Sequence, residues 1–210
     1  MTINRRKMLG AGAAGLMLAG IGAVALRTRG TSPDAMTIDD VLHDPDNPVL
    51  GNPGGRLTIV EYFDYQCPFC KRDHDMLTNV VAGDGDIRLV MKDWPIFGAP
   101  SVLASQLVFG AASAGGYEAA HSALMATDAR LTEDQVRQAL AAGGTDTDAA
   151  LAAYRAERGK WDGLLARNAA QAAALGLGGT PAFIIGTTLY SGALGEARLR
   201  AAIAEARQMS

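Results

Sequence analysis

The chain contains, at residues 57–70, the run Leu57-Thr58-Ile59-Val60-Glu61-Tyr62-Phe63-Asp64-Tyr65-Gln66-Cys67-Pro68-Phe69-Cys70. Its first half is β-branched and aromatic, which is typical of a buried strand. A polar stretch of helical character follows Cys70 as far as about Val81, and Pro68 suits a first helical turn because its missing N–H would be unpaired there. We therefore predict a C-x-x-C motif at the junction between a buried strand and a helix.

The two cysteines of the chain, Cys67 and Cys70, are too close in sequence to act as a structural staple, since a bridge between them closes almost no loop. At a helix N-terminus the free N–H groups and the helix dipole stabilise an anion, so we expect a thiolate at Cys67. Cys70 lies one turn further along, where its sulfur can reach the first. The alternative is half of a zinc or copper site, but His43, His74 and His121 make no second pair at ligand spacing.

The rest of the chain extends this unit on both sides. An alternating segment at 87–91 predicts a second strand, and 182–185 with 189–190 predict two more, before an amphipathic helix at 196–207. Between them lies a helical block at about 99–176. The order β-α-β, helical block, β-β-α predicts an α/β thioredoxin-like fold over 56–208, with the block inserted between the two halves and long enough to form a small subdomain.

Within the helical block, residues 101–114 are almost wholly apolar or small and predict a buried helix. Thr132 and Gln135 have the spacing of a capping box. Caps at 145–148 precede what we expect to be one long alanine-rich helix that ends at the glycines near 176. His121 is expected to face the core with a local partner, whereas His74 is expected to be a solvated helix residue.

The N-terminal residues 1–26 have the layout of a secretory signal, with basic Arg5-Arg6-Lys7 before an uncharged Gly/Ala-rich run. The Arg5-Arg6 pair is similar to a twin-arginine signal, and an uncleaved membrane anchor is the alternative. A cleaved signal and an uncleaved anchor would both place the folded part outside the cytoplasm, either free in the periplasm or tethered to the membrane. In that compartment a dithiol can cycle through a disulfide. Residues 27–55 are expected to form a linker and an irregular lead-in, with a short helical turn at 37–42.

The composition narrows the possible partners. With 210 residues the chain is long enough for one domain, or for one domain with an insertion. The net charge of −3 excludes a strongly basic protein, so we expect no binding of nucleic acid, which requires a basic face.

Two further positions have competing interpretations. Thr180-Pro181 follows a glycine-rich turn and precedes an apolar strand: a trans proline is the ordinary case, because only about 5–6% of X-Pro bonds are cis, but a cis bond would place backbone beside the cysteine sulfurs. Glu61 alternates with Val60 and Tyr62 and so faces the other side of its strand. It is either a solvated acid at the sheet edge or a carboxyl buried beneath the cysteines that exchanges a proton with Cys70.

At this point the sequence resembles the DsbA family of thiol–disulfide oxidoreductases. The resemblance runs from Asp44 to the C-terminus and rests on four segments: DPDNPVLGNP at 44–53, VEYFDYQCPFCK at 60–71, KDWPI at 92–96 and GTPAF at 179–183.

The resemblance implies a role for each candidate residue. Cys67 would be the nucleophile and Cys70 the resolving cysteine, and their redox-active disulfide would take the place of any cofactor. Pro181 would be a cis-proline, Thr180 would present its backbone to a substrate peptide, and Glu61 would be the family's buried acid.

The resemblance also implies the partners, the oligomeric state and the oxidising strength of the protein. We expect an oxidase of folding exported proteins that contain cysteines, recycled by a membrane redox partner, and a monomer, because the chain has no room for the dimerisation domain of related isomerases. A reductase or isomerase, or a non-catalytic copper- or zinc-binding thiol module, are the alternatives. Phe69 stands where the best-known family member has histidine, and Lys71 and Arg72 are expected on a solvated face, so we expect a milder oxidant.

Overall fold

The computed structural model describes residues 36–209. The predicted signal or anchor at 1–26 and the linker up to residue 35 therefore lie outside the described residues. A five-stranded sheet, in the order β1-β3-β2-β4-β5, is formed by β1 (Val49–Gly51), β2 (Leu57–Phe63), β3 (Ile87–Asp93), β4 (Ala182–Ile185) and β5 (Thr188–Ser191). β2 and β3 run parallel, while the other neighbouring strands pair antiparallel.

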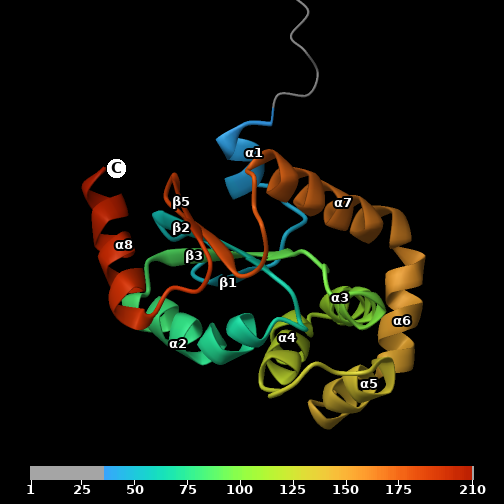
Figure 1. Ribbon diagram of the computed structural model, residues 1–210. Helices are drawn as coiled ribbons and strands as arrows, with labels where there is room; N and C mark the ends of the chain where they lie inside the picture. The colour runs from blue at the N-terminus through green and yellow to red at the C-terminus, as the bar shows by residue number, and fades with distance from the viewer. Residues whose placement is uncertain (1–35, 210) are drawn as a thin grey trace, which may run out of the picture. The chain divides into compact units, whose positions relative to one another are not determined.

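Helices cover both faces of this sheet. They are α1 (Ile38–Leu42), α2 (Pro68–Asp84), α3 (Ala99–Ala112), α4 (Tyr117–Met125), α5 (Glu133–Ala142), α6 (Thr147–Ala156), α7 (Arg158–Ala174) and α8 (Glu196–Gln208). Figure 1 shows α2 and α8 on one side of the sheet and α1 and α7 on the other. The helices α3 to α7 connect β3 to β4, so the predicted order of elements is observed.

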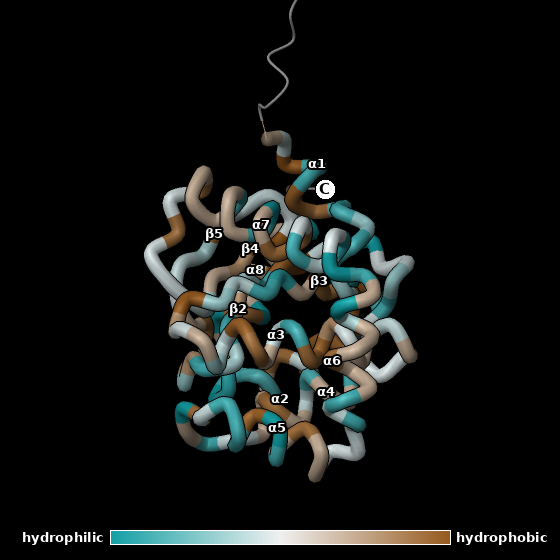
Figure 2. The backbone as a smooth tube through the Cα atoms, turned by 90° about the vertical axis from the view of Figure 1, so that its right-hand side faces the viewer, coloured by the Kyte–Doolittle hydropathy of each residue, from teal (hydrophilic) through white to brown (hydrophobic). Residues whose placement is uncertain are grey.

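The alternation along β2 decides which side chains reach which layer. Val60 and Tyr62 pack in a core with residues of α1 and α7, whereas Ile59 and Phe63 pack in the core that includes α2 and α8. Successive strand residues point to opposite faces, so Glu61 belongs to the side of α2. Figure 2 shows hydrophobic and hydrophilic residues alternating along the helices, as expected of helices with one face on a core.

Two local predictions are wrong. The lead-in before residue 56 is not irregular throughout, because β1 pairs with β3 from Val49 opposite Val90. The long alanine-rich helix is two helices, α6 and α7, which meet at Glu157 with φ −110° and ψ 24°. The Tyr154 hydroxyl donates to Asp162 across this bend, and Asp162 also pairs with Arg158 at the start of α7.

Candidate active site

Cys67 occupies the junction between β2 and α2. It is the N-cap of α2, and Pro68 is the first helical residue, as the sequence predicts. The Cys67 Sγ accepts a hydrogen bond from the backbone N–H of Cys70 at 3.4 Å. In its thiol form it also donates one to the carbonyl oxygen of Thr180 at 3.2 Å. Both cysteines are free thiols and are buried. The helix end thus offers its unpaired N–H groups to the first sulfur.

The two sulfurs differ in their acidity. Hydrogen bonding from Cys70, by side chain and backbone, outweighs burial and lowers the pKa of Cys67 from 9.0 to about 6. Burial raises the pKa of Cys70 well above its ordinary value, with further contributions from the hydrogen bond to Cys67 and from the charge of Glu61. At neutral pH the reduced site therefore holds a thiolate at Cys67 and a thiol at Cys70.

The loop before β4 completes the site, because β4 runs antiparallel to β2 and its first residue, Ala182, lies opposite Tyr62 near the end of β2. The Thr180–Pro181 peptide bond is cis. This loop brings the Thr180 carbonyl into contact with the Cys67 sulfur, although the two residues are 113 positions apart in the sequence. A segment of backbone therefore borders the reactive sulfur, where an extended peptide could lie alongside it.

Glu61 is buried rather than solvated at a sheet edge. Glu61 is 4% exposed, and on β2 it lies between Met91 on β3 and Phe183 on β4. Burial, and then the negative charge of Cys67, raises the pKa of Glu61 to about 8. At neutral pH Glu61 is mostly protonated, so the structure brings a carboxylic acid beneath the cysteine pair.

His121 faces the core with a local partner, as predicted: its Nδ1 lies 3.0 Å from the Tyr65 hydroxyl. The prediction for His74 is wrong, because this residue is 8% exposed and its ring centroid lies 5.0 Å from that of His121. His74 follows Cys70 by four positions, and residues at this spacing share a helix face. That face of α2 is turned inward.

Lys71 is also buried, contrary to the prediction of a solvated position. It is 9% exposed, and its Nζ donates to the Thr127 hydroxyl at 2.7 Å and to the Ala129 carbonyl at 2.5 Å. Both acceptors lie in the α4–α5 loop, which the local sequence around the cysteines could not indicate. Arg72, the next residue, is exposed as predicted and pairs with Asp73 at 2.6 Å.

Asp64 is an organising residue that the sequence analysis did not single out. Its Oδ1 accepts hydrogen bonds from the Gln66 N–H at 2.6 Å and the Ser101 hydroxyl at 2.7 Å. Its Oδ2 accepts from the N–H groups of Ile96 at 2.6 Å and Phe97 at 3.1 Å. A buried acid with four donors joins the loop before α2 to the loop after β3. Its position directly after an apolar strand was the one available clue.

Residues 36–209 contain no group of three or more His, Cys, Asp or Glu side chains that could hold a metal ion. In the same range, no helix combines the length and apolar character needed to cross a bilayer.

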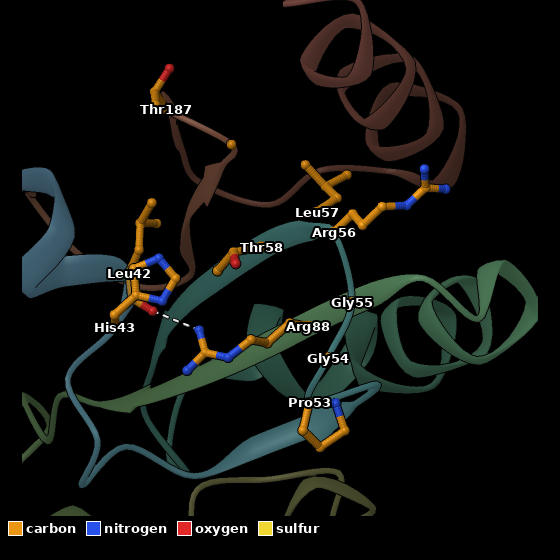
Figure 3. Close-up of a pocket in the computed structure, with 11 residues that line it drawn as sticks. Leu42, His43, Pro53, Gly54, Gly55, Arg56, Leu57, Thr58, Arg88 and Thr187 are labelled. Atoms are coloured by element: carbon orange, nitrogen blue, oxygen red, sulfur yellow. Dashed lines mark hydrogen bonds between the residues drawn. The ribbon is translucent and has the colours of Figure 1, made fainter. Parts of the chain in front are cut away.

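A pocket of about 410 Å³ lies near the first residues of β2, Leu57 and Thr58 (Figure 3). Cys67 lies beyond the opposite end of that strand, which ends at Phe63. Inside the pocket, the Arg88 guanidinium donates to the carbonyl of Leu42 at 2.7 Å. This bond ties the end of α1 to the sheet. The pocket is therefore separate from the cysteine pair.

Comparison with known proteins identifies the family of the chain. The DSBA-like thioredoxin domain family matches residues 58–204. A thioredoxin-like oxidoreductase from Silicibacter pomeroyi is 35% identical with a TM-score of 0.78, over 83% of this chain and 100% of that one. A periplasmic thioredoxin-like protein from Salmonella enterica serovar Typhimurium is 28% identical with a TM-score of 0.69, over 80% and 94%.

ScsC from Proteus mirabilis, in a compact conformation, is 26% identical with a TM-score of 0.69, over 83% of this chain and 78% of that one. None of the curated proteins compared matches the chain. The family match shows that the chain belongs to the DsbA-like thioredoxin domain family, and it is a thiol–disulfide oxidoreductase. The resemblance and the thioredoxin-like α/β fold class are thereby confirmed.

Proposed function

We propose that this protein oxidises cysteine pairs of folding exported proteins, with Cys67 as the nucleophilic sulfur and Cys70 as the resolving one. The observation that carries the proposal is the difference in acidity between the two thiols. A low thiol pKa stabilises the reduced enzyme, and a stabilised reduced form makes the corresponding disulfide an oxidant. The pKa of Cys67, about 6, lies between about 7 for thioredoxin and about 3.5 for the strongly oxidising DsbA.

The reaction begins with the Cys67–Cys70 disulfide. A client thiolate attacks the Cys67 sulfur, a mixed disulfide forms, and Cys70 leaves as a thiolate. Because Glu61 is buried and protonated beneath the pair, it supplies the proton that makes Cys70 a neutral thiol. A second client thiolate then attacks the client sulfur of the mixed disulfide and releases Cys67 as a thiolate. The client loses two electrons and the enzyme gains them.

The loop before β4 has a binding role in this scheme. The Thr180 carbonyl lies 3.2 Å from the Cys67 sulfur, so a client whose cysteine reaches Cys67 also reaches this backbone. We assign to Thr180 and Pro181 the task of holding the client segment in an extended form beside the sulfur. Main-chain hydrogen bonds of this kind give affinity without requiring one client sequence.

Re-oxidation and location complete the proposal. A membrane redox partner would take two electrons from the dithiol and restore the disulfide, as is general for the DsbA-like family. The basic and then apolar pattern of residues 1–26, and the periplasmic relative from Salmonella, support an extracytoplasmic location. We propose that the protein acts there as a monomer.

Disulfide transfer to a client tests the proposed direction. We expect the oxidised protein, mixed with a reduced unfolded two-cysteine client in the absence of other oxidants, to yield one client disulfide for each enzyme disulfide consumed. Trapping of free thiols with an alkylating reagent and mass spectrometry would count both. If the oxidised protein leaves the client reduced, while the reduced protein opens a client disulfide, the enzyme is a reductase.

A further inference from the structure

The residues directly before and after the C-x-x-C motif hold the same distant loop. Gln66 precedes the motif, and its Oε1 accepts a hydrogen bond from the N–H of Leu131 at 2.6 Å. Lys71 follows the motif, and its Nζ donates to Thr127 and Ala129 at 2.7 and 2.5 Å. We call these three contacts between the motif and residues 127–131 of the α4–α5 loop the clamp.

The two motif residues of the clamp are buried, while its loop residues are half-buried or exposed. Gln66 is 2% exposed and Lys71 is 9% exposed. Burial of an ammonium group is costly unless its donors find acceptors, and both acceptors of Lys71 are neutral oxygens. In residues 36–209 no carboxylate forms a direct ion pair with it. The structure therefore keeps a cation next to the motif without neutralising it by direct contact.

The charges that face Lys71 come from three elements. Asp64 lies on the loop before α2, Asp128 lies on the α4–α5 loop, and Cys67 begins α2. Lys71 is one helical turn beyond Cys67, and its backbone N–H donates to the carbonyl of Cys67 at 3.2 Å. Phe69, which is 52% exposed, supplies no charge between them.

We propose that Lys71 is a positioning residue of the redox centre: the α4–α5 loop anchors its ammonium group, and this charge, on a residue one turn beyond Cys67, favours the thiolate there. This inference rests on the proposed role of Cys67 as the nucleophile. It also gives the inserted helices a part in the chemistry, because the loop between α4 and α5 supplies the anchor. Without Lys71 the thiolate loses a nearby positive charge, and the reduced enzyme becomes less favoured.

The test compares Lys71→Met with Arg72→Gln, a matched control. Arg72 is the adjacent cation, but it is exposed and already paired with Asp73. For Lys71→Met we expect the Cys67 thiolate absorbance to titrate about one pH unit higher, and the equilibrium constant for reduction by glutathione to fall about tenfold. Arg72→Gln should change either quantity by less than about twofold, and Lys71→Arg should restore most of the loss.

A second variant keeps the test decisive if Lys71→Met does not fold. Thr127→Val removes one of the two anchors and keeps the charge, so we expect a smaller upward shift of the same titration. A folded Lys71→Met protein that titrates as the wild type does would overturn the inference. So would an unchanged titration in Thr127→Val if Lys71→Met is not folded. A wild-type Cys67 that titrates near pH 9 would instead reject the proposed function, so the two failures are distinguishable.

Discussion

Replacing Cys70 with serine is expected to leave clients covalently attached to Cys67, whereas replacing Cys67 with serine should leave no attached client. Cys67 has a pKa of about 6, and burial keeps the pKa of Cys70 far above the working pH. The thiolate is the attacking species in disulfide exchange. At pH 7, a pKa about two to three units above that of Cys67 already lowers the thiolate fraction of a thiol by about tenfold to a hundredfold.

The two serine variants are matched controls for each other, because each retains one sulfur of the same motif. Non-reducing electrophoresis of extracts from cells that express each variant would show mixed disulfides as bands of higher mass that disappear with reductant. Equal trapping by the Cys67→Ser protein would contradict the assignment of the two roles. Disulfide turnover should be lost in both variants, because each lacks one of the two sulfurs of the catalytic disulfide.

Replacing Glu61 with glutamine is expected to stabilise the reduced protein by about 3 kcal/mol at pH 7. The folded-state pKa of Glu61 is raised from 4.5 to about 8, chiefly by burial. A carboxyl group whose pKa is raised by folding does not reduce the free energy of unfolding at pH values below its pKa in the unfolded chain. The reduction grows as the pH rises from 4.5 to about 8. Wild-type stability should fall across this window relative to that of Glu61→Gln.

Urea unfolding of both proteins, with reductant and at several pH values, would measure this difference. Cys67 contributes with the opposite sign, since its lowered pKa adds stability as the pH rises from about 6 to 9. Cys67 is present in both proteins, so the comparison reports Glu61 together with its coupling to the charge of Cys67. The glutamine cannot supply a proton to Cys70, so we also expect disulfide transfer to slow by about a hundredfold. Parallel stability curves with unchanged transfer would exclude a proton role for Glu61.

The local sequence was sufficient to predict the motif and the elements that carry it. The apolar run before Asp64 and the proline after Cys67 define a strand and a helix start within a few residues. β1 was missed because three residues are too few to show a period, and its partner lies on β3. The bend at Glu157 was missed because alanine-rich sequence favours a helix on either side of it.

The parts of the site that were missed depend on contacts between residues that are far apart in the chain. Lys71 meets Thr127 at a separation of 56 residues, and Gln66 meets Leu131 at a separation of 65. Nothing in the composition near the cysteines distinguishes a buried lysine from a solvated one. Glu61 could be placed on the correct face by alternation, but its burial depends on helix α2 and strand β4 covering it.

The reduction potential of the Cys67–Cys70 pair tests the central claim most directly. Equilibration with glutathione, together with denaturant unfolding of both redox forms, would measure it twice, because 30 mV corresponds to about 1.4 kcal/mol. We expect a value above the approximately −270 mV of thioredoxin and below the approximately −120 mV of DsbA, with the reduced form more stable than the oxidised form. A potential at or below that of thioredoxin, with a more stable oxidised form, would contradict the oxidase account while leaving the fold and the cysteine pair in place.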